Sequence, residues 1–186
     1  TNSLTDSTEF YLMIHEYPLV NQRPSGIDDG INYNPEGTVS LSLFAPNKDF
    51  VYVIGDFNDW RINEDYYMNK DFGSIDSVHY WITLDSLTSG VDYAFQYVVD
   101  GDIRIADPYS DKVLDKWNDQ HISSDIYPNL KPYPYGKTDH IVSVFQTNQT
   151  PFPWQFSSEF SRPKKEELII YELLVRDFLS RSDFET

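Results

Sequence analysis

A six-residue segment, GDFNDW at residues 55–60, holds the side chains best suited to bind a ligand. It directly follows the apolar run VYVI, so it is expected to form a turn at the end of a strand. Asp56, Asn58 and Asp59 can accept hydrogen bonds from backbone amides in such a turn. Trp60 ends the segment, and a flat ring at a sheet edge can stack on the apolar C–H face of a sugar. The same ring can instead cap the hydrophobic core, so both interpretations of Trp60 stay open.

Other kinds of chemistry find little support in the residue types present. The chain has no Cys, which excludes thiolate zinc sites and Cys nucleophiles. The four histidines are far apart and show no metal-ligand spacing: His15, His79, His121 and His140. No phosphate-binding loop, G-x-S-x-G or G-x-G-x-x-G segment occurs. We therefore predict no catalytic residue, no metal site and no cofactor in this chain, although calcium in a larger parent protein stays open.

The charge of the chain bears on its partners. It carries 30 acidic and 14 basic residues, for a formal net charge of −16. This field repels phosphate backbones and anionic lipid surfaces, so we predict no nucleic-acid partner. No apolar run reaches the roughly 20 residues of a spanning helix, so membrane insertion is not expected either. Neutral ligands such as uncharged sugars are not disfavoured.

The elements that must position residues 55–60 are short strands. The segment VSLSLF at residues 39–44 alternates apolar and polar side chains, which predicts a half-buried strand. No helical period persists between residues 38 and 126, and a two-residue turn at Asp100 and Gly101 predicts a hairpin. The further strands are expected at residues 50–57, 78–84, 91–99, 103–107 and 121–126. This pattern predicts a mainly β chain built around an antiparallel β-sandwich of immunoglobulin-like size.

The whole chain divides into four predicted parts. Residues 1–36 form an N-terminal extension with one or two strands, and residues 37–130 form the β-sandwich. Residues 131–167 form an ordered connector that is rich in proline and aromatic residues and holds one more strand at residues 139–145. Residues 168–186 begin with the apolar run LIIYELLV, typical of a strand buried on both faces in a parallel sheet.

The order of three segments resembles a known family. GDFNDW is followed by FQYVVDG at residues 95–101 and by IADPYS at residues 105–110. Together they resemble the N-terminal β-sandwich of α-amylase-superfamily enzymes (glycoside hydrolase family 13). Such sandwiches are similar to family 48 carbohydrate-binding modules and to the glycogen-binding module of the AMP-activated kinase β subunit. The segment LIIYELLVRDF, at residues 168–178, resembles the first strand of the (β/α)₈ barrel of the same enzymes.

The resemblance implies an enzyme whose catalytic part lies elsewhere. Family members use two carboxylates on later barrel strands, and neither D-x-x-x-N-H nor G-x-R-x-D occurs in this chain. Glu172 and Asp177 match positions that are not catalytic in the family. We therefore expect this chain to be inactive alone and to have the missing catalytic barrel of the same protein as a partner. A lone strand at residues 168–178 is expected to be disordered, to fold onto the sandwich or to self-associate.

The family's sugar-binding residues carry over in part. Trp60 matches one aromatic platform, whereas Ile103 stands where binding members have a second Trp. Gln96 stands where the binding members have a Lys, and Asn118 lies approximately where they have an Asn. The resemblance thus implies a sandwich that mainly supports the catalytic barrel, with α-glucan as a partner that is bound weakly, roughly in the millimolar range, where it binds at all. The alternatives are a stand-alone glycan-binding or regulatory module and an adhesion sandwich unrelated to sugar.

The compartment is indicated only indirectly. Polymer-degrading enzymes are often exported, which favours the bacterial periplasm, the extracellular space or the cell surface. The absence of Cys is compatible with either side of a bacterial membrane. Thr1 is not an initiator Met, so we expect that the N-terminus has been trimmed. This trimming is compatible with the loss of an export signal.

Overall fold

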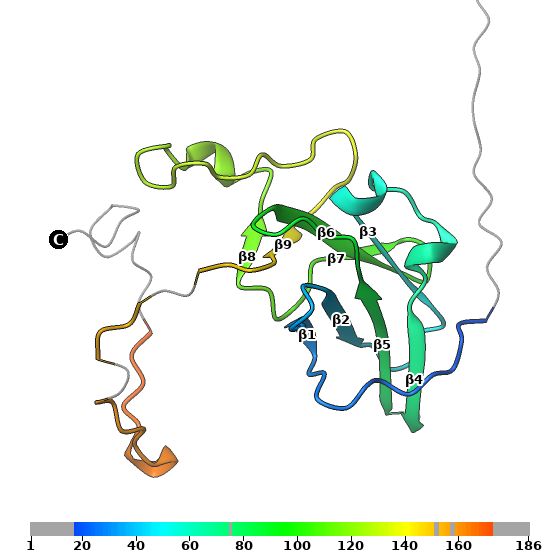
Figure 1. The fold of residues 1–186 in the computed structure, drawn as a ribbon, viewed down its shortest axis with the longest axis horizontal. Helices are drawn as coiled ribbons and strands as arrows, with labels where there is room; N and C mark the ends of the chain where they lie inside the picture. Colours follow the sequence, from blue (N-terminus) through cyan, green and yellow to red (C-terminus); the bar gives the residue numbers. More distant parts are fainter. Residues whose placement is uncertain (1–16, 75, 151–152, 157–158, 173–186) are drawn as a thin grey trace, which may run out of the picture.

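The computed structural model describes residues 17–74, 76–150, 153–156 and 159–172. These residues form a mainly β fold of two antiparallel sheets, which confirms the predicted sandwich (Figure 1). The first sheet has the order β1-β2-β5-β4, from strands Gly30–Tyr33, Val39–Phe44, Ser77–Leu84 and Asn69–Ser74. The second has the order β3-β6-β9-β8, from strands Val51–Gly55, Asp92–Val99, Val142–Gln146 and Lys112–Leu114. β7 (Ile103–Ile105) also pairs with β6.

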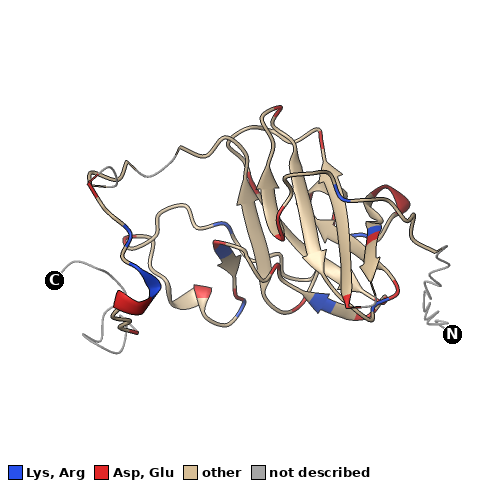
Figure 2. Cartoon of the chain, turned by 90° about the horizontal axis from the view of Figure 1, so that it is seen from below, with Lys and Arg blue, Asp and Glu red and all other residues tan. Residues whose placement is uncertain are grey.

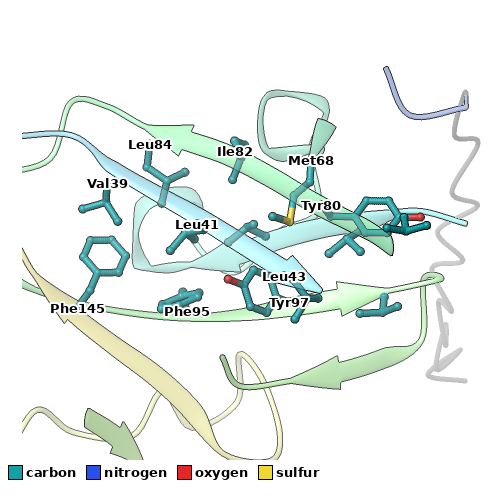
Figure 3. Packing of buried hydrophobic residues seen from close by; sticks show 14 residues of the cluster. Val39, Leu41, Leu43, Met68, Tyr80, Ile82, Leu84, Phe95, Tyr97 and Phe145 are labelled. Atoms are coloured by element: carbon teal, nitrogen blue, oxygen red, sulfur yellow. The ribbon is translucent and has the colours of Figure 1, made fainter. Parts of the chain in front are cut away.

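The main core lies between the two sheets, where alternate residues of each strand point inward. Val39, Leu41 and Leu43 face it from β2, and Phe95 and Tyr97 face it from β6. Figure 3 shows these side chains meeting those of β5 and β9, and Phe57 packs against the same cluster. The period-two pattern read from the sequence is therefore confirmed, because only one face of each strand can reach the opposite sheet. The predicted half-burial of residues 39–44 is wrong, since Ser40 and Ser42 are each only 1% exposed.

The second sheet is buried on its outer face as well. A second apolar cluster covers this face with side chains from β3, β6, β8 and β9 and from the loops beside them: Phe50, Tyr52, Ile54, Trp60, Ala94, Val98, Leu114, Tyr133, Val142 and Val144. Tyr133 comes from the long loop between β8 and β9, residues 115–141, which is called the β8–β9 loop below. This loop contains η3 (Asp119–His121) and leads the chain across the outer face.

Several predicted boundaries are corrected by the structure. β9 pairs with β6 and β8 although it lies in the segment predicted as a connector, so the sandwich extends past residue 130. Residues 121–126 form no strand, because the chain there follows a 3₁₀ turn and further bends. β4 was not predicted, and the β6–β7 connection has three residues because Val99 pairs with Ile103.

The two ends of the chain add less to the sandwich. β1 lies in the N-terminal extension, in a segment whose Asn, Gly, Pro and Asp residues are typical of turns, so this strand was not predicted at its position. Most of residues 9–20, the apolar segment in which a strand was expected, lies outside the described residues. In the last part, η4 (Lys165–Glu167) is followed by residues 168–172 without a strand assignment. Ile169 and Ile170 are 96% and 86% exposed there. The remainder of the predicted barrel strand, residues 173–175, lies outside the described residues, so that strand stays a prediction.

Helices are short throughout the part of the chain that the structure describes. The remaining 3₁₀ turns are η1 (Asp56–Asn58) and η2 (Glu64–Tyr66). Among the described residues, none of the helices has the length and apolarity needed to cross a membrane.

Stacked tyrosines on the outer face predict how stability changes at alkaline pH. The rings of Tyr52 and Tyr67 are stacked with centroids 4.4 Å apart, and burial, helped by the nearby Glu64 charge, raises the pKa of each to about 12. Below pH 10 both hydroxyls are neutral in the folded and unfolded states, so their contribution to stability is complete. We expect the free energy of unfolding to fall from about pH 10 to pH 12, because only the unfolded chain ionises readily there.

Denaturant unfolding across this pH range measures the effect. Tyr67→Phe should weaken the alkaline fall, whereas Tyr17→Phe, at a ring that is 95% exposed, should leave it unchanged. An alkaline fall that is the same in all three proteins would show that the stacked pair is not its source.

Candidate functional site

The GDFNDW turn is held by its own small and polar residues. A Cβ on Gly55 would lie 2.5 Å from the Ala94 carbonyl oxygen, so only glycine allows β3 to approach β6 this closely. The Asn58 side chain bridges the strand end, since its Oδ1 accepts from Gly55 N at 2.9 Å and its Nδ2 donates to Val53 O at 2.9 Å. These contacts explain the Gly and Asn of the motif by structure alone.

Asp56 and Trp60 form the centre of the turn. Asp56 Oδ1 accepts from the indole Nε1 of Trp60 at 3.1 Å, and Asp56 Oδ2 accepts from Ala94 N at 2.8 Å. Asp59 and Trp60 both have left-handed backbones, with φ of 52° and 62°, which is unusual for a residue as bulky as Trp. Trp60 is only 5% exposed and belongs to the outer apolar cluster. In this conformation the ring caps a core and offers no open face to a sugar.

Gln96 lies on the same outer face as Trp60. Its side chain is fully buried, and its Nε2 donates to the carbonyl oxygens of Asp139 and Ile141 at 2.7 and 2.8 Å. Gln96 is the residue of β6 between the stretch that pairs with β9 and the stretch that pairs with β7. Its amide thereby ties the end of the β8–β9 loop to the sheet, and in this conformation it does not reach solvent.

The other two positions implied by the resemblance lie apart from this buried pair. Asn118 is exposed in the β8–β9 loop, where its Nδ2 donates to Asp115 Oδ2 at 2.5 Å. Ile103 is 42% exposed at the start of β7. The structure therefore brings Trp60 and Gln96 together under one loop, while Asn118 belongs to the loop itself.

The β8–β9 loop covers the face on which sugar binding was predicted. Lys131 Nζ lies 3.1 Å from Asp56 Oδ2, and Lys137 Nζ lies 2.5 Å from Asp59 Oδ1. Thr138 Oγ1 donates to Gln96 Oε1, and Figure 1 shows the loop passing beside η1. This covering of the face by the β8–β9 loop was not predicted from the sequence. The only sequence feature that indicated a packed loop was the aromatic and proline-rich segment at residues 127–137. A local pattern does not reveal which face such a segment packs on.

Asp107, from the IADPYS segment, organises a second group of contacts. Its Oδ2 accepts from the Tyr97 hydroxyl and its Oδ1 from Tyr109 N, both at 2.7 Å, while its own backbone N donates to Ser143 Oγ at 2.7 Å. Burial raises the pKa of the Asp107 carboxyl, although the bonds from Tyr97 and Tyr109 oppose this effect. Asp107 thus links the chain after β7 to both β6 and β9.

A cleft of about 640 Å³ lies between the open edges of the two sheets. Three tyrosines from separate segments line it, namely Tyr33 of β1, Tyr109 after β7 and Tyr127 of the β8–β9 loop. Charged, amide and apolar residues also line it: Asp92, Asp111, Lys112, Asn129, Gln146, Gln149, Ile31, Pro128, Val144 and Phe145. This site is called the tyrosine cleft below. This cleft was not predicted from the sequence, because its three tyrosine rings are far apart in the chain.

Charged side chains are distributed over loops and strand ends rather than gathered in one place (Figure 2). Among the described residues, no group of three or more His, Cys, Asp or Glu side chains could hold a metal ion.

A family model and two known proteins match parts of this chain. The family model described as carbohydrate-binding module 48 (isoamylase N-terminal domain) matches residues 30–110. Two Clostridium perfringens proteins, 1,4-alpha-glucan branching enzymes GlgB and GlgB 2, are 34% and 35% identical to this chain over 86 residues. Each match covers 44% of this chain, which spans only 12% of the relative's length.

A solved structure is also similar over part of the chain. It is the product complex of SpuA, a multi-modular glycogen-degrading pneumococcal virulence factor, at 20% identity and a TM-score of 0.33. The similarity covers 53% of this chain and 11% of the other. The family match begins at β1, includes GDFNDW and FQYVVDG, and ends at the last residue of IADPYS. Residues 30–110 are therefore similar to the carbohydrate-binding module 48 family, described as the isoamylase N-terminal domain.

Proposed function

We propose that this chain is the non-catalytic N-terminal module of an α-amylase-type enzyme that acts on α-glucans, and that it mainly supports the catalytic barrel. The observation that carries the proposal is the 86-residue match to two enzymes named 1,4-alpha-glucan branching enzymes. Because the chain spans 12% of their length, the greater part of such an enzyme would lie outside it. The resemblance of residues 168–178 to a first barrel strand supports the same proposal.

The burial of Trp60 and Gln96 favours a role in supporting the barrel over a role in binding sugar. Both side chains are used within the fold, Trp60 in an apolar cluster and Gln96 in bonds to the β8–β9 loop. The end of the described chain has the opposite character, since Phe156, Phe160 and Tyr171 are 68%, 72% and 78% exposed. Large apolar side chains in such number are the kind of surface that a further domain covers.

Activity measurements test this proposal directly. The gene is expected to encode the remaining barrel strands and their catalytic carboxylates after residue 186. This chain should release no new reducing ends from amylopectin, whereas the longer protein should produce or rearrange α-glucan chains. Removing residues 17–150 from the longer protein should lower the midpoint of thermal unfolding of the barrel, because the barrel would lose the surface against which it packs.

Three outcomes would contradict the proposed function. Measurable turnover by this chain alone would show that it is catalytic. A stop codon soon after residue 186 would favour a stand-alone glycan-binding or regulatory sandwich. A barrel of unchanged stability without the sandwich would contradict the supporting role. Within the longer protein, Glu172→Gln is expected to retain activity, because the matching family position is not catalytic.

A further inference from the structure

The tyrosine cleft is separate from the face that the family resemblance points to. Its lining includes none of residues 55–60 and does not include Gln96. It lies instead beside β1, at the edge of the first sheet, and β8, at the edge of the second. A volume of about 640 Å³ falls within the range of about 300–1,000 Å³ that is typical of small-ligand sites.

The rings in the cleft are available to a ligand. Tyr33, Tyr109 and Tyr127 are 52%, 63% and 43% exposed. Each tyrosine combines an apolar ring face with a hydroxyl group that can donate and accept hydrogen bonds. A sugar has the complementary surface, since its C–H face is apolar and its rim carries hydroxyl groups. Three such rings around one cleft therefore suit a carbohydrate better than a wholly apolar ligand.

The walls of the cleft are fixed by contacts that the structure shows. Gly30 has a left-handed φ of 99°, and a Cβ there would lie 2.7 Å from Tyr109 Cβ, so glycine makes room for this tyrosine. Tyr109 N also donates to Asp107 Oδ1 at 2.7 Å. On the opposite side, Lys112 Nζ lies 5.3 Å from the centroid of the Tyr127 ring. A wall that is already in place reduces the entropy lost when a ligand binds.

Charge further restricts the ligand. Among the residues that the structure describes, Lys112 is the only cation in the lining, and its Nζ is 2.6 Å from Asp92 Oδ2, so its charge is largely neutralised. Asp111 adds a further negative charge. An anionic ligand such as a phosphate ester would be repelled, whereas a neutral ligand can use the amides of Asn129 and Gln149.

We propose that the tyrosine cleft binds a neutral oligosaccharide, specifically a short α-glucan chain. The choice of an α-glucan over other neutral sugars rests on the proposed function. The cleft would give the module a sugar site that is separate from the buried residues Trp60 and Gln96. This site is built from Tyr33, Tyr109 and Tyr127.

Titration of the chain with maltoheptaose, followed by backbone amide chemical shifts, tests the inference. Shifts are expected at residues 109–112, 127–129 and 144–146. Tyr109→Ala and Tyr127→Ala should each weaken binding by about ten-fold, which corresponds to about 1.4 kcal/mol. The affinity of Tyr109→Phe for maltoheptaose should stay within about two-fold of the parent's, because this variant keeps the aromatic ring. The same variant shows that the site still folds when residue 109 is changed. Tyr135→Ala is the matched control, since Tyr135 is an exposed tyrosine of the same loop outside the cleft.

Three results would overturn the inference. One is no saturable shift at maltoheptaose concentrations well above the millimolar range. Another is shifts confined to residues 55–60 and 131–138, which would place the sugar on the Trp60 face. The third is an affinity that neither tyrosine substitution changes although both variants retain the parent's circular dichroism spectrum. None of these results bears on the activity of the longer protein, which tests the proposed function separately.

Discussion

Trp60→Ala is expected to lower the free energy of unfolding by about 3–5 kcal/mol, the usual range for removing a buried Trp or Phe side chain. Trp60 is 5% exposed, packs in the outer apolar cluster and donates its indole N–H to Asp56. Alanine would leave a cavity beneath the β8–β9 loop and would keep the unfavourable left-handed backbone, since φ at this position is 62°. Urea unfolding followed by circular dichroism measures the change.

Trp117→Ala provides the matched control for this substitution. Trp117 is 54% exposed in the β8–β9 loop, with Lys116 Nζ 4.2 Å from its ring centroid. Its loss should change the free energy of unfolding by no more than about 1 kcal/mol. If Trp60→Ala kept full stability and lost affinity for maltoheptaose, Trp60 would be the sugar platform that the family resemblance implied. The structure predicts the reverse, so a binding assay on this variant requires a stability measurement beside it.

The second large effect is expected at Asp107. Replacing it with alanine should lower the free energy of unfolding by about 3 kcal/mol, because one buried donor and one partly buried donor would lose their acceptor. These donors are the Tyr97 hydroxyl, on a fully buried side chain, and the backbone N of Tyr109. The turn that follows would also lose its connection to β6, and Tyr109 would lose its fixed position in the tyrosine cleft.

Tyr97→Phe separates the contributions to this network. It removes only the hydroxyl, so Asp107 keeps its bond from Tyr109 N, and the expected loss is about 1 kcal/mol. Asp107→Asn should fall between the two variants, because the amide keeps an acceptor for one donor. Urea unfolding of all three variants gives the order, and equal losses for Tyr97→Phe and Asp107→Ala would contradict the shared role of this carboxylate.

The sandwich was predictable from the sequence wherever packing imposes a local period. Val39, Leu41 and Leu43 alternate because one face of β2 meets the opposite sheet, and this alternation is visible without any structure. β4, with the sequence NKDFGS, was missed because it is a partly exposed edge strand that contributes little apolar surface. β9 was recognised as a strand but placed in a connector, since its pairing with β6 is non-local.

The candidate site was predictable only as a set of residue types. The resemblance identified Trp60 and Gln96, but their burial depends on Lys131, Lys137 and Thr138, which are distant in the sequence. The tyrosine cleft was not predictable for the same reason, because Gly30 and Tyr109 meet only after the sheets have formed. Local sequence patterns specify strands, whereas the contents of a surface site depend on long-range packing.

The shared edge of β6 has a consequence for how the chain reaches its native state. β7 pairs with one half of this edge and follows β6 directly, whereas β9 pairs with the other half after a long intervening loop. Closing a longer loop carries a larger entropy loss, so the local hairpin should form first and β9 should join late. Until it does, the early half of β6 presents unpaired backbone groups that a second nascent chain can capture, which makes rapid docking of β9 a protection against aggregation.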